Sequence, residues 1–271
     1  MSHPECAATI HRTMTQNTFK QAIGRFERRV GLWLSLANAY TTEICASAGF
    51  EWVLIDGEHG PGDLRGTLQQ LQALAAYPAH PVVRLPSDDP TLVKQYLDIG
   101  ARSLLIPMVN SAAQAQALAS AMRYPPQGRR GVGGGLVRAT GWGLEADYIH
   151  TANAQVCLLV QIETGAALQA LDEICAVDGV DGIFIGPADL AADLGYPGQP
   201  THPVVQEAVD QAMRRAIALG KPVGTVTGDA ALARHYFALG ASFVAVGGDT
   251  TLLASASRRL AADFELRPAR P

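Results

Sequence analysis

The feature that most constrains the fold is an alternation of short apolar runs with amphipathic stretches, repeated eight times along 271 residues. Apolar runs bounded by turn residues are typical of buried strands, and apolar residues spaced three and four apart are typical of helices. The expected strands are 31–36, 52–55, 81–84, 103–107, 155–162, 182–185, 222–227 and 243–246. The expected helices are 41–48, 62–76, 90–99, 112–122, 166–176, 203–219, 229–239 and 250–264.

The apolar runs are continuous rather than alternating, which indicates a parallel sheet covered on both faces. Eight such units in one chain predict an α/β fold of the closed (β/α)8 TIM-barrel type. An open, doubly wound sheet is the alternative. Its nucleotide-binding form has little support, because no Gly-x-Gly-x-x-Gly motif follows the first expected strand.

Composition and charge limit the classes of partner. Hydrophobic residues make up 48% of the chain, and a net charge of −4 gives no electrostatic footprint for nucleic acid. No segment approaches the roughly 18 apolar residues that a membrane span needs, and the polar start does not resemble a signal peptide. The four cysteines lack C-x-x-C spacing, which fits free thiols in a reducing compartment. We therefore expect a cytoplasmic protein with a small substrate and no nucleic-acid or membrane partner.

The expected domain organisation is simple. A polar extension occupies 1–18, one barrel domain occupies 19–265, and a tail occupies 266–271. A single domain of roughly 250 residues is common for this fold.

Two carboxylates follow buried apolar runs, Glu163 directly after 156–162 and Asp189 shortly after 182–185. Buried charges are rare unless they are paired or bound to a metal. In a parallel barrel both would emerge at the carboxyl-end rim, where two hard oxygen ligands predict a Mg²⁺ or Mn²⁺ site. The alternative is that Asp189 caps a short helix near Leu190 and that Glu163 pairs with Arg84.

Other polar side chains stand at the same expected rim. Asp-Gly-Glu-His-Gly at 56–60 follows the second strand, Arg84 ends the third, and Gln161 faces the same side as Glu163 because side chains alternate along a strand. His59 is a candidate base or proton relay, with a hydrogen-bonded loop histidine as the alternative. Arg84 is a candidate cation for the reaction, or else a structural ion-pair partner for the acidic residues of 56–60.

Three other features leave their interpretation open. Asp98 in the last turn of its helix opposes the helix dipole, a mild hint of a special partner. The stretch 123–153 is long for a loop, which is typical of a functional or disordered segment. It must cross the barrel to reach the rim; the alternative is a surface excursion with a short helix near 144–151. Gly247-Gly248 leads either to an anion-receiving helix terminus or to a turn capped by Asp249 or Thr250.

Lysine usage argues against an amine-based mechanism. The chain has only Lys20, Lys94 and Lys221, and none is expected at the carboxyl end of a strand. A Schiff base at the barrel mouth therefore has no candidate amine. Carbanion chemistry at this rim would have to rely on a metal.

Five motifs, in order along roughly 19–264, together resemble the HpcH/HpaI aldolase family. They are Gly-Glu-His-Gly at 57–60, Pro-Val-Val-Arg at 81–84, Tyr-Pro-Pro with Arg-Gly-Val at 124–132, Val-Gln-Ile-Glu-Thr at 160–164, and Val-Asp-Gly-Ile-Phe-Ile-Gly-Pro-Ala-Asp-Leu at 180–190. The resemblance implies a (β/α)8 barrel whose last helix is exchanged between subunits of a homohexamer, a dimer of trimers. It also implies a class II lyase that cleaves 4-hydroxy-2-oxo acids, such as 4-hydroxy-2-oxoheptanedioate, to pyruvate and an aldehyde such as succinic semialdehyde.

The resemblance also implies roles for individual residues. Glu163 and Asp189 would hold the divalent cation, with Mg²⁺ or Mn²⁺ ahead of Co²⁺ or Zn²⁺. Gln161 and the segment Gly186, Pro187, Ala188 and Asp189 would bind the pyruvate carboxylate, notably through the Ala188 amide. His59 would be the base, Asp98 would raise its basicity, and Arg84 would stabilise the enolate.

Two other functions stay open within this scaffold. One is 2-dehydro-3-deoxyglucarate aldolase, which would release tartronate semialdehyde with pyruvate. The other is a non-catalytic pyruvate-binding relative, against which the presence of His59 counts. The glycine-rich stretch 131–143 leaves the preferred aldehyde undecided.

Overall fold

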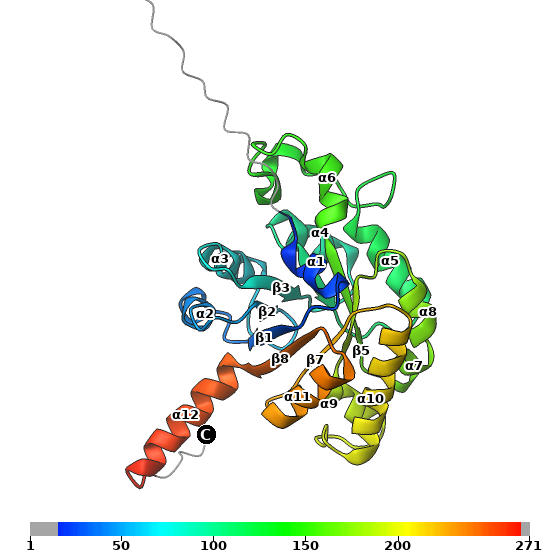
Figure 1. Cartoon of the computed structure of the whole chain (residues 1–271). Coiled ribbons are helices and arrows are strands. Elements are labelled where there is room, and N and C mark those ends of the chain that lie inside the picture. The colour runs from blue at the N-terminus through cyan, green and yellow to red at the C-terminus, as the bar shows by residue number, and fades with distance from the viewer. Residues whose placement is uncertain (1–15, 267–271) are drawn as a thin grey trace, which may run out of the picture.

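The computed structural model describes residues 16–266 and contains a closed barrel of eight parallel strands in sequence order (Figure 1). The strands are β1 (Arg29–Leu34), β2 (Trp52–Asp56), β3 (His80–Arg84), β4 (Ser103–Ile106), β5 (Cys157–Ile162), β6 (Gly182–Ile185), β7 (Val223–Val226) and β8 (Phe243–Gly248). β1 pairs with both β2 and β8, which closes the sheet. The expected barrel is confirmed, and the open doubly wound sheet is wrong.

Helices surround the barrel or cover its ends. They are α1 (Thr18–Gly24), α2 (Ala39–Ala46), α3 (Leu64–Leu74), α4 (Pro90–Asp98), α5 (Ala112–Met122), α6 (Tyr148–Gln155), α7 (Gly165–Gln169), α8 (Leu171–Ala176), α9 (Pro187–Asp193), α10 (Pro203–Ala218), α11 (Ala230–Leu239) and α12 (Asp249–Asp263). Two short 3-10 helices, η1 (Gly134–Leu136) and η2 (Arg138–Thr140), lie between α5 and α6. Side chains of Asn38, Asp63, Asp89 and Ser111 accept hydrogen bonds at the starts of α2 to α5, as such residues commonly do.

The core has two layers. The larger lies between strands and helices, and includes Val53, Val83 and Val160. The smaller fills the barrel interior with side chains such as Leu54, Val82 and Phe184. Because side chains alternate along a strand, the residue two positions beyond each interior side chain also points inward. This alternation delivers polar side chains to the carboxyl end of the barrel interior.

Helix α1 closes the amino end of the barrel. Phe19 and Ile23 are buried with the interior layer, and the Phe19 ring lies 5.7 Å from the rings of both Trp52 and Phe243. The Asn17 side chain caps α1 and also donates to Ser103 Oγ at 3.1 Å. The sequence patterns above did not predict this helix.

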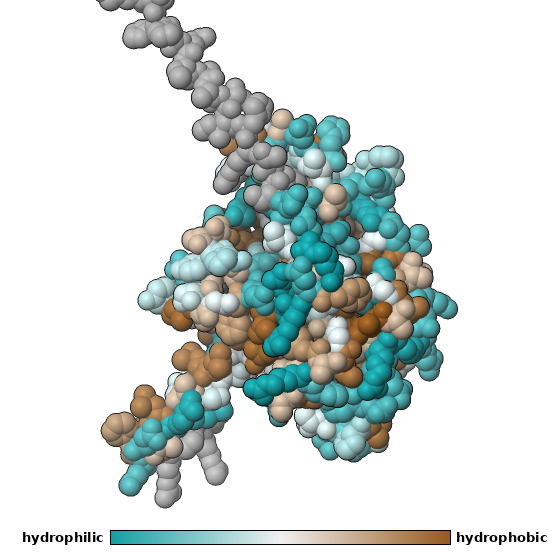
Figure 2. Space-filling view, viewed as in Figure 1, coloured by the Kyte–Doolittle hydropathy of each residue, from teal (hydrophilic) through white to brown (hydrophobic). Residues whose placement is uncertain are grey.

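Helix α12 stands apart from the helical ring and projects from the barrel after β8 (Figure 1). The apolar residues Leu252, Leu253, Leu260 and Phe264 are more than half exposed on this arm. Brown surface along the arm in Figure 2 marks the same character. Exchange of this helix between subunits stays a prediction.

The stretch 123–153 holds η1, η2 and the start of α6, so its helix begins at Tyr148 rather than near 144. Most of the expected extension 1–18 and of the tail 266–271 lies outside the described residues. None of the described helices is long and apolar enough to cross a membrane.

Candidate active site

An acidic and basic network forms where β2 and β3 end. Asp56 and Arg84 are direct partners in the parallel register, and both side chains are buried. Arg84 Nε donates to Asp56 Oδ1 at 3.0 Å, and Arg84 Nη1 lies 2.7 Å from Glu58 Oε2. The guanidinium also lies over the Trp33 ring, 4.8 Å from its centroid. Arg84 thus forms the structural ion pairs that were the alternative interpretation. These contacts hold its guanidinium at the rim.

Asp56 organises the loop that carries His59. Asp56 Oδ1 accepts from the backbone N–H groups of Glu58 and His59, while Oδ2 accepts from Trp33 Nε1 and Ser35 Oγ. Burial would raise the pKa of Asp56, but the Arg84 charge and these hydrogen bonds outweigh it and lower the pKa below its ordinary value. Asp56 is therefore an ionised anchor.

His59 itself is exposed, and its ring makes no hydrogen bond within the described part of the chain. A loop histidine held by its own hydrogen bonds is therefore not observed. The ring is accessible to a ligand at the rim.

Glu163 follows β5 and is almost completely buried. Its Oε1 accepts from the Met108 N–H at 2.7 Å, and its Oε2 accepts from Gln161 Nε2 at 2.6 Å. No ion pair joins Glu163 to Arg84 in residues 16–266, so this alternative is wrong. Gln161 Oε1 is buried without a hydrogen-bond partner there, which leaves one inward acceptor available to a ligand.

Gly186 lets the backbone after β6 pass close to these two side chains. A Cβ at this position would lie 2.4 Å from Glu163 Oε2 and 2.8 Å from Gln161 Nε2. Helix α9 then begins at Pro187, so Asp189 lies in its first turn and does not cap it. Because proline has no N–H, the Ala188 and Asp189 amides are the first donors at this helix start.

The carboxylates at the rim influence one another. Burial raises the pKa of Glu163 to about 7, with the Met108 N–H opposing and the charges of Asp189 and Glu58 adding to the rise. Burial also raises the pKa of Glu58, against the opposing charge of Arg84 and with a contribution from Asp189. Three acidic groups are therefore close enough to interact electrostatically.

This donor set fits a hard divalent cation. Mg²⁺ and Mn²⁺ prefer oxygen ligands and retain positions for water or substrate. A cation between Glu163 and Asp189 would offset both the burial of the Glu163 carboxylate and its repulsion from Asp189. Within the described residues no group of three or more His, Cys, Asp or Glu side chains is arranged to hold a metal ion. Glu163 and Asp189 would therefore be the only such ligands offered here, and substrate or water would have to supply the others.

Asp98 lies away from these residues within one chain. Helix α4 starts after the carboxyl end of β3 and returns to the amino end of β4, so its last residue lies at the opposite end of the barrel from His59. Asp98 Oδ1 accepts from Arg130 Nη2 at 2.8 Å, and Arg130 lies over the Tyr124 ring. The expectation that Asp98 acts on His59 is not met inside one subunit.

The other open features have structural explanations. Arg138 in η2 donates to the Ile99 carbonyl at 2.8 Å, so the stretch 123–153 stays at the amino end and does not reach the rim of its own barrel. Helix α12 begins at Asp249 with Gly248 at its N-cap and no side-chain cap hydrogen bond, so neither Asp249 nor Thr250 caps it. The Asp249 carboxylate accepts instead from the backbone N–H groups of Ser35 and Leu36. It thereby ties the end of β8 to the loop after β1.

The lysines are placed as expected. Lys20 pairs with Asp181 at 3.1 Å, and Lys221 donates to the Val180 carbonyl at 2.6 Å, both at the amino end. Lys94 lies within α4. No lysine stands at the carboxyl end of a strand.

Three residues of this site were not predicted from the sequence. Trp33, Ser35 and Met108 contribute an aromatic face, a hydroxyl and a backbone amide. Trp33 and Ser35 could have been predicted as site residues, since they lie at the carboxyl end of an expected strand. The Met108 amide could not, because any residue except proline supplies a backbone N–H.

The sequence is similar to those of known aldolases over most of its length. The sequence is 57% identical over 252 residues to hydroxypyruvate/pyruvate aldolase of Cupriavidus necator, covering 93% of this chain and 94% of the relative. It is 53% identical over 249 residues to 4-hydroxy-2-oxo-heptane-1,7-dioate aldolase of Salmonella dublin, covering 92% and 95%.

A solved structure of an HpcH/HpaI aldolase/citrate lyase family protein from Burkholderia cenocepacia J2315 superposes with a TM-score of 0.88 at 40% identity, covering 92% of this chain and all of the other. The family model described as HpcH/HpaI aldolase/citrate lyase matches residues 29–256. The chain belongs to the HpcH/HpaI aldolase/citrate lyase family.

Proposed function

We propose that this chain is a divalent-metal-dependent pyruvate aldolase that cleaves 4-hydroxy-2-oxo acids reversibly to pyruvate and an aldehyde. The observation that carries the proposal is that Gly186 brings the start of the helix holding Asp189 against the buried Glu163 carboxylate. Glu163 there interacts electrostatically with Asp189 and Arg84, at a rim where none of the three lysines stands. The family and the aldolase names of relatives at 53–57% identity support the reaction class.

Glu163 and Asp189 would hold the cation, which when bound draws electron density from the 2-oxo acid and so favours the enolate. Gln161 and the amides of Ala188 and Asp189 would bind the substrate carboxylate, since the helix start offers donors with no partner within the helix. Mg²⁺ or Mn²⁺ suits these oxygen ligands best, with Co²⁺ or Zn²⁺ as alternatives.

Arg84 would stabilise the negative charge of the enolate, and His59 would transfer the proton of the C4 hydroxyl. Arg84 is held by Asp56 and Glu58, so its positive charge is fixed beside the site before the reaction begins. His59 is accessible and can accept the proton of the C4 hydroxyl, directly or through water, as the C3–C4 bond breaks. In the reverse direction it returns that proton to the new hydroxyl.

The 2-oxo acid partner has a second candidate. Relatives at 57% and 59% identity are named hydroxypyruvate/pyruvate aldolase. Hydroxypyruvate in place of pyruvate adds one hydroxyl at C3 and keeps the two oxygens that a cation would bind. The two candidate aldehyde products are succinic semialdehyde and tartronate semialdehyde, both of which carry a carboxylate.

The assembly proposal is a hexamer with α12 exchanged between subunits. The exposed apolar side of α12 supports it, because a single chain leaves this face without cover. Since Asp98 lies at the barrel end opposite His59, it could act on His59 only in another subunit. A cytoplasmic location fits the same proposal.

The test is an assay that couples pyruvate release to lactate dehydrogenase. We expect a chelator to abolish release from 4-hydroxy-2-oxoheptanedioate, and Mg²⁺ or Mn²⁺ to restore it. A panel of 4-hydroxy-2-oxo acids and aldehydes, run with pyruvate or hydroxypyruvate, identifies the substrate. Full activity in chelator would exclude the metal mechanism, and inactivity across the panel with every metal would exclude the aldolase.

A further inference from the structure

A buried arginine lies next to Asp98, in the long segment between α5 and α6. The Arg130 side chain is 0% exposed, and its Nη2 donates to Asp98 Oδ1 at 2.8 Å. Its guanidinium lies 4.4 Å from the centroid of the Tyr124 ring and 5.9 Å from that of the Tyr148 ring. Arg130 is therefore enclosed by two aromatic rings and one carboxylate.

The two rings are fixed by contacts of their own. They pack edge to face with their centroids 6.3 Å apart, and they form a small buried cluster with Ala152 of α6. Asn153 Oδ1 accepts from the Tyr124 N–H at 2.7 Å, and Asn153 Nδ2 donates to the Tyr124 carbonyl at 3.1 Å. A planar guanidinium between such fixed rings has little freedom to turn.

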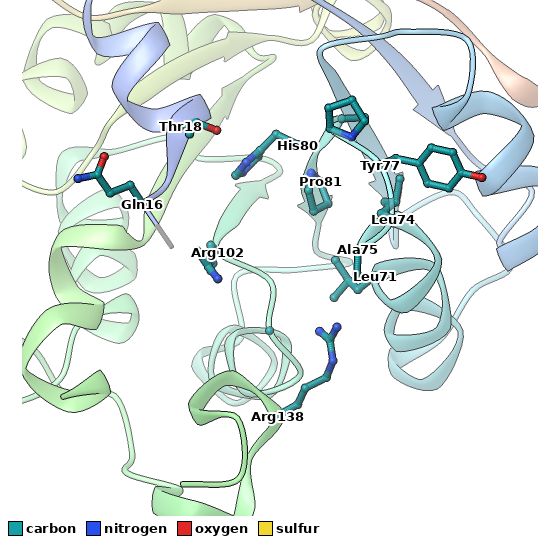
Figure 3. A pocket seen from close by; sticks show the side chains of 13 residues that line it. Gln16, Thr18, Leu71, Leu74, Ala75, Tyr77, His80, Pro81, Arg102 and Arg138 are labelled. Carbon is teal, nitrogen blue, oxygen red and sulfur yellow. The ribbon is translucent and has the colours of Figure 1, made fainter. Parts of the chain in front are cut away.

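The same segment contacts the end of α4 at two successive residues. Arg130 pairs with Asp98, and Arg138 Nη1 donates to the Ile99 carbonyl at 2.8 Å. Figure 3 shows Arg138 extending from η2 toward the amino end of the barrel. The Gly133 backbone lies beside Asp98 as well, since a Cβ there would be 3.6 Å from Asp98 Oδ2. The segment therefore holds the Asp98 side chain in place.

Stability alone does not explain a guanidinium at this position. Nε and Nη1 of Arg130 are buried and have no hydrogen-bond partner within residues 16–266. Each unsatisfied buried donor costs about 1–3 kcal/mol, and apolar groups of similar volume often replace a buried ion pair without loss of stability. The guanidinium is better explained by what it does to the carboxylate of Asp98.

Asp98 keeps one oxygen for another partner. Its side chain is 19% exposed, and the hydrogen bond from Arg130 goes to Oδ1, which leaves Oδ2 for another donor. Val132 and Leu136 follow in the same segment and are 59% and 90% exposed, so the surface close to Asp98 is apolar. A second copy of this chain that covers this surface would meet Asp98 there.

We propose that Arg130 is a positioning residue, which holds Asp98 of one subunit in the orientation that lets it support His59 of the partner subunit. The inference rests on the proposed function, in which Asp98 acts on His59 only across a subunit boundary. A fixed carboxylate beside an imidazole orients the ring and stabilises its protonated form. Arg130 thus acts through Asp98 and not on the substrate.

Steady-state release of pyruvate from 4-hydroxy-2-oxoheptanedioate with Mg²⁺ tests this role. Arg130→Met fills the same space without charge and should lower kcat by about tenfold or more, since a small misplacement of a catalytic group can cost about 10²-fold. KM and the melting temperature should change little. Arg123→Met removes an ion pair with Asp178 at the same end of the barrel and should leave kcat unchanged. Wild-type kcat in Arg130→Met would overturn the proposal.

A double-mutant cycle separates positioning from a general structural role. If Arg130 acts through Asp98, the double variant Arg130→Met and Asp98→Asn should have the same kcat as Asp98→Asn alone. A further loss in the double variant would show that Arg130 acts independently of Asp98. If Arg130→Met does not fold, Arg130→Lys takes its place in the cycle, because it keeps the charge but lacks the planar geometry.

Co-expression of two differently tagged variants tests the subunit boundary, with mixed assemblies isolated through both tags. His59→Ala with Asp98→Asn should regain activity, because some sites then combine an intact His59 with an intact Asp98. His59→Ala with Arg130→Met should regain activity for the same reason. Asp98→Asn with Arg130→Met should not exceed the mean of the two single variants, because every site then lacks one of the pair.

The outcomes distinguish the two levels of the proposal. An inactive wild type would exclude the proposed function, and the role of Arg130 would fall with it. An active wild type in which His59→Ala and Asp98→Asn do not complement each other would exclude action of Asp98 on the partner subunit. If they do complement each other, recovery in the pair Asp98→Asn and Arg130→Met would overturn the role of Arg130 alone.

Discussion

Gly186 lies where the backbone leaves β6 and passes the Glu163 carboxylate. Its missing side chain is what allows Glu163 and Gln161 to approach the loop that carries Asp189. The requirement is one of space rather than of φ, since this glycine has a negative φ of −92°. The position of Glu163 after β5, next to the start of α9, thus depends on the lack of a Cβ at Gly186.

We expect Gly186→Ala to weaken metal binding and to lower kcat by about tenfold or more, because the new methyl group displaces the Glu163 carboxylate. Mn²⁺ titration followed by electron paramagnetic resonance measures the affinity. Gly24→Ala is the matched control, as a Cβ there has no neighbour within 4 Å. Unchanged Mn²⁺ affinity in Gly186→Ala would remove Glu163 from the ligand set.

Arg84 combines a structural and a proposed chemical role. We expect Arg84→Ala to lower kcat about 10²-fold, as the loss of one electrostatic stabiliser does. It should also lower stability by about 3 kcal/mol, because Asp56 is left buried without its cation. Thermal unfolding and steady-state kinetics below the melting temperature separate the two effects. Wild-type kcat with lower stability, or a change in KM alone, would leave Arg84 without the role of enolate stabiliser.

At this scale the sequence was informative about residue types and less so about contacts. Residues 56–60, Arg84, Gln161 and Glu163 were placed at the rim because strand ends can be recognised from apolar runs. The partner of Asp98 was not predicted, because its contact with Arg130 depends on how the long segment after α5 folds. The amide of Met108 could not be predicted at all, because it depends on how the loop after β4 folds.

Among the elements, all eight strands and most helices matched their expected positions within a few residues. The elements that were not predicted lie outside the repeat of an apolar run followed by a helical stretch. Helix α1 precedes the repeat and is fixed by packing of Phe19 and Ile23 inside the barrel. The 3-10 helices η1 and η2 are short, glycine-rich and held by tertiary contacts such as that of Arg138 with Ile99.

Helix α12 is the element whose environment is incomplete in one chain. We expect the double substitution Leu253→Glu and Leu260→Glu to reduce the assembly to smaller species, because buried charges would then oppose association. Sedimentation velocity measures the species present. Ser257→Glu places one charge on the same exposed helix and is the control. Retention of the wild-type assembly in the double variant would contradict the exchange of α12.

For the molecule as a whole, His80 predicts a pH dependence of stability. Its folded-state pKa of about 3 lies below the ordinary value of 6.5, so the unfolded chain binds more protons between these values. The contribution of His80 is therefore complete above about pH 6.5 and is lost as the pH falls toward 3.

Between pH 7 and pH 4 the raised pKa of Glu163 adds stability as the pH falls, in wild type and variant alike. We therefore expect the free energy of unfolding of the wild type, relative to that of His80→Gln, to fall over this range. Urea unfolding at several pH values measures the slope. His235→Gln is the control, because that histidine is partly exposed and pairs with Asp210 at the surface. Equal slopes in wild type and His80→Gln would show that His80 is not the titrating group.

The pairing of β1 with β8 joins the two ends of the sequence, and Phe19 of α1 packs against Phe243 of the last strand. On the ribosome, the first elements therefore emerge long before their partners are synthesised. Until then the edge of β1 and the apolar face of α1 stay open to wrong pairing in the nascent chain. Chaperone demand during translation should therefore be greatest before the segment around Phe243 leaves the exit tunnel.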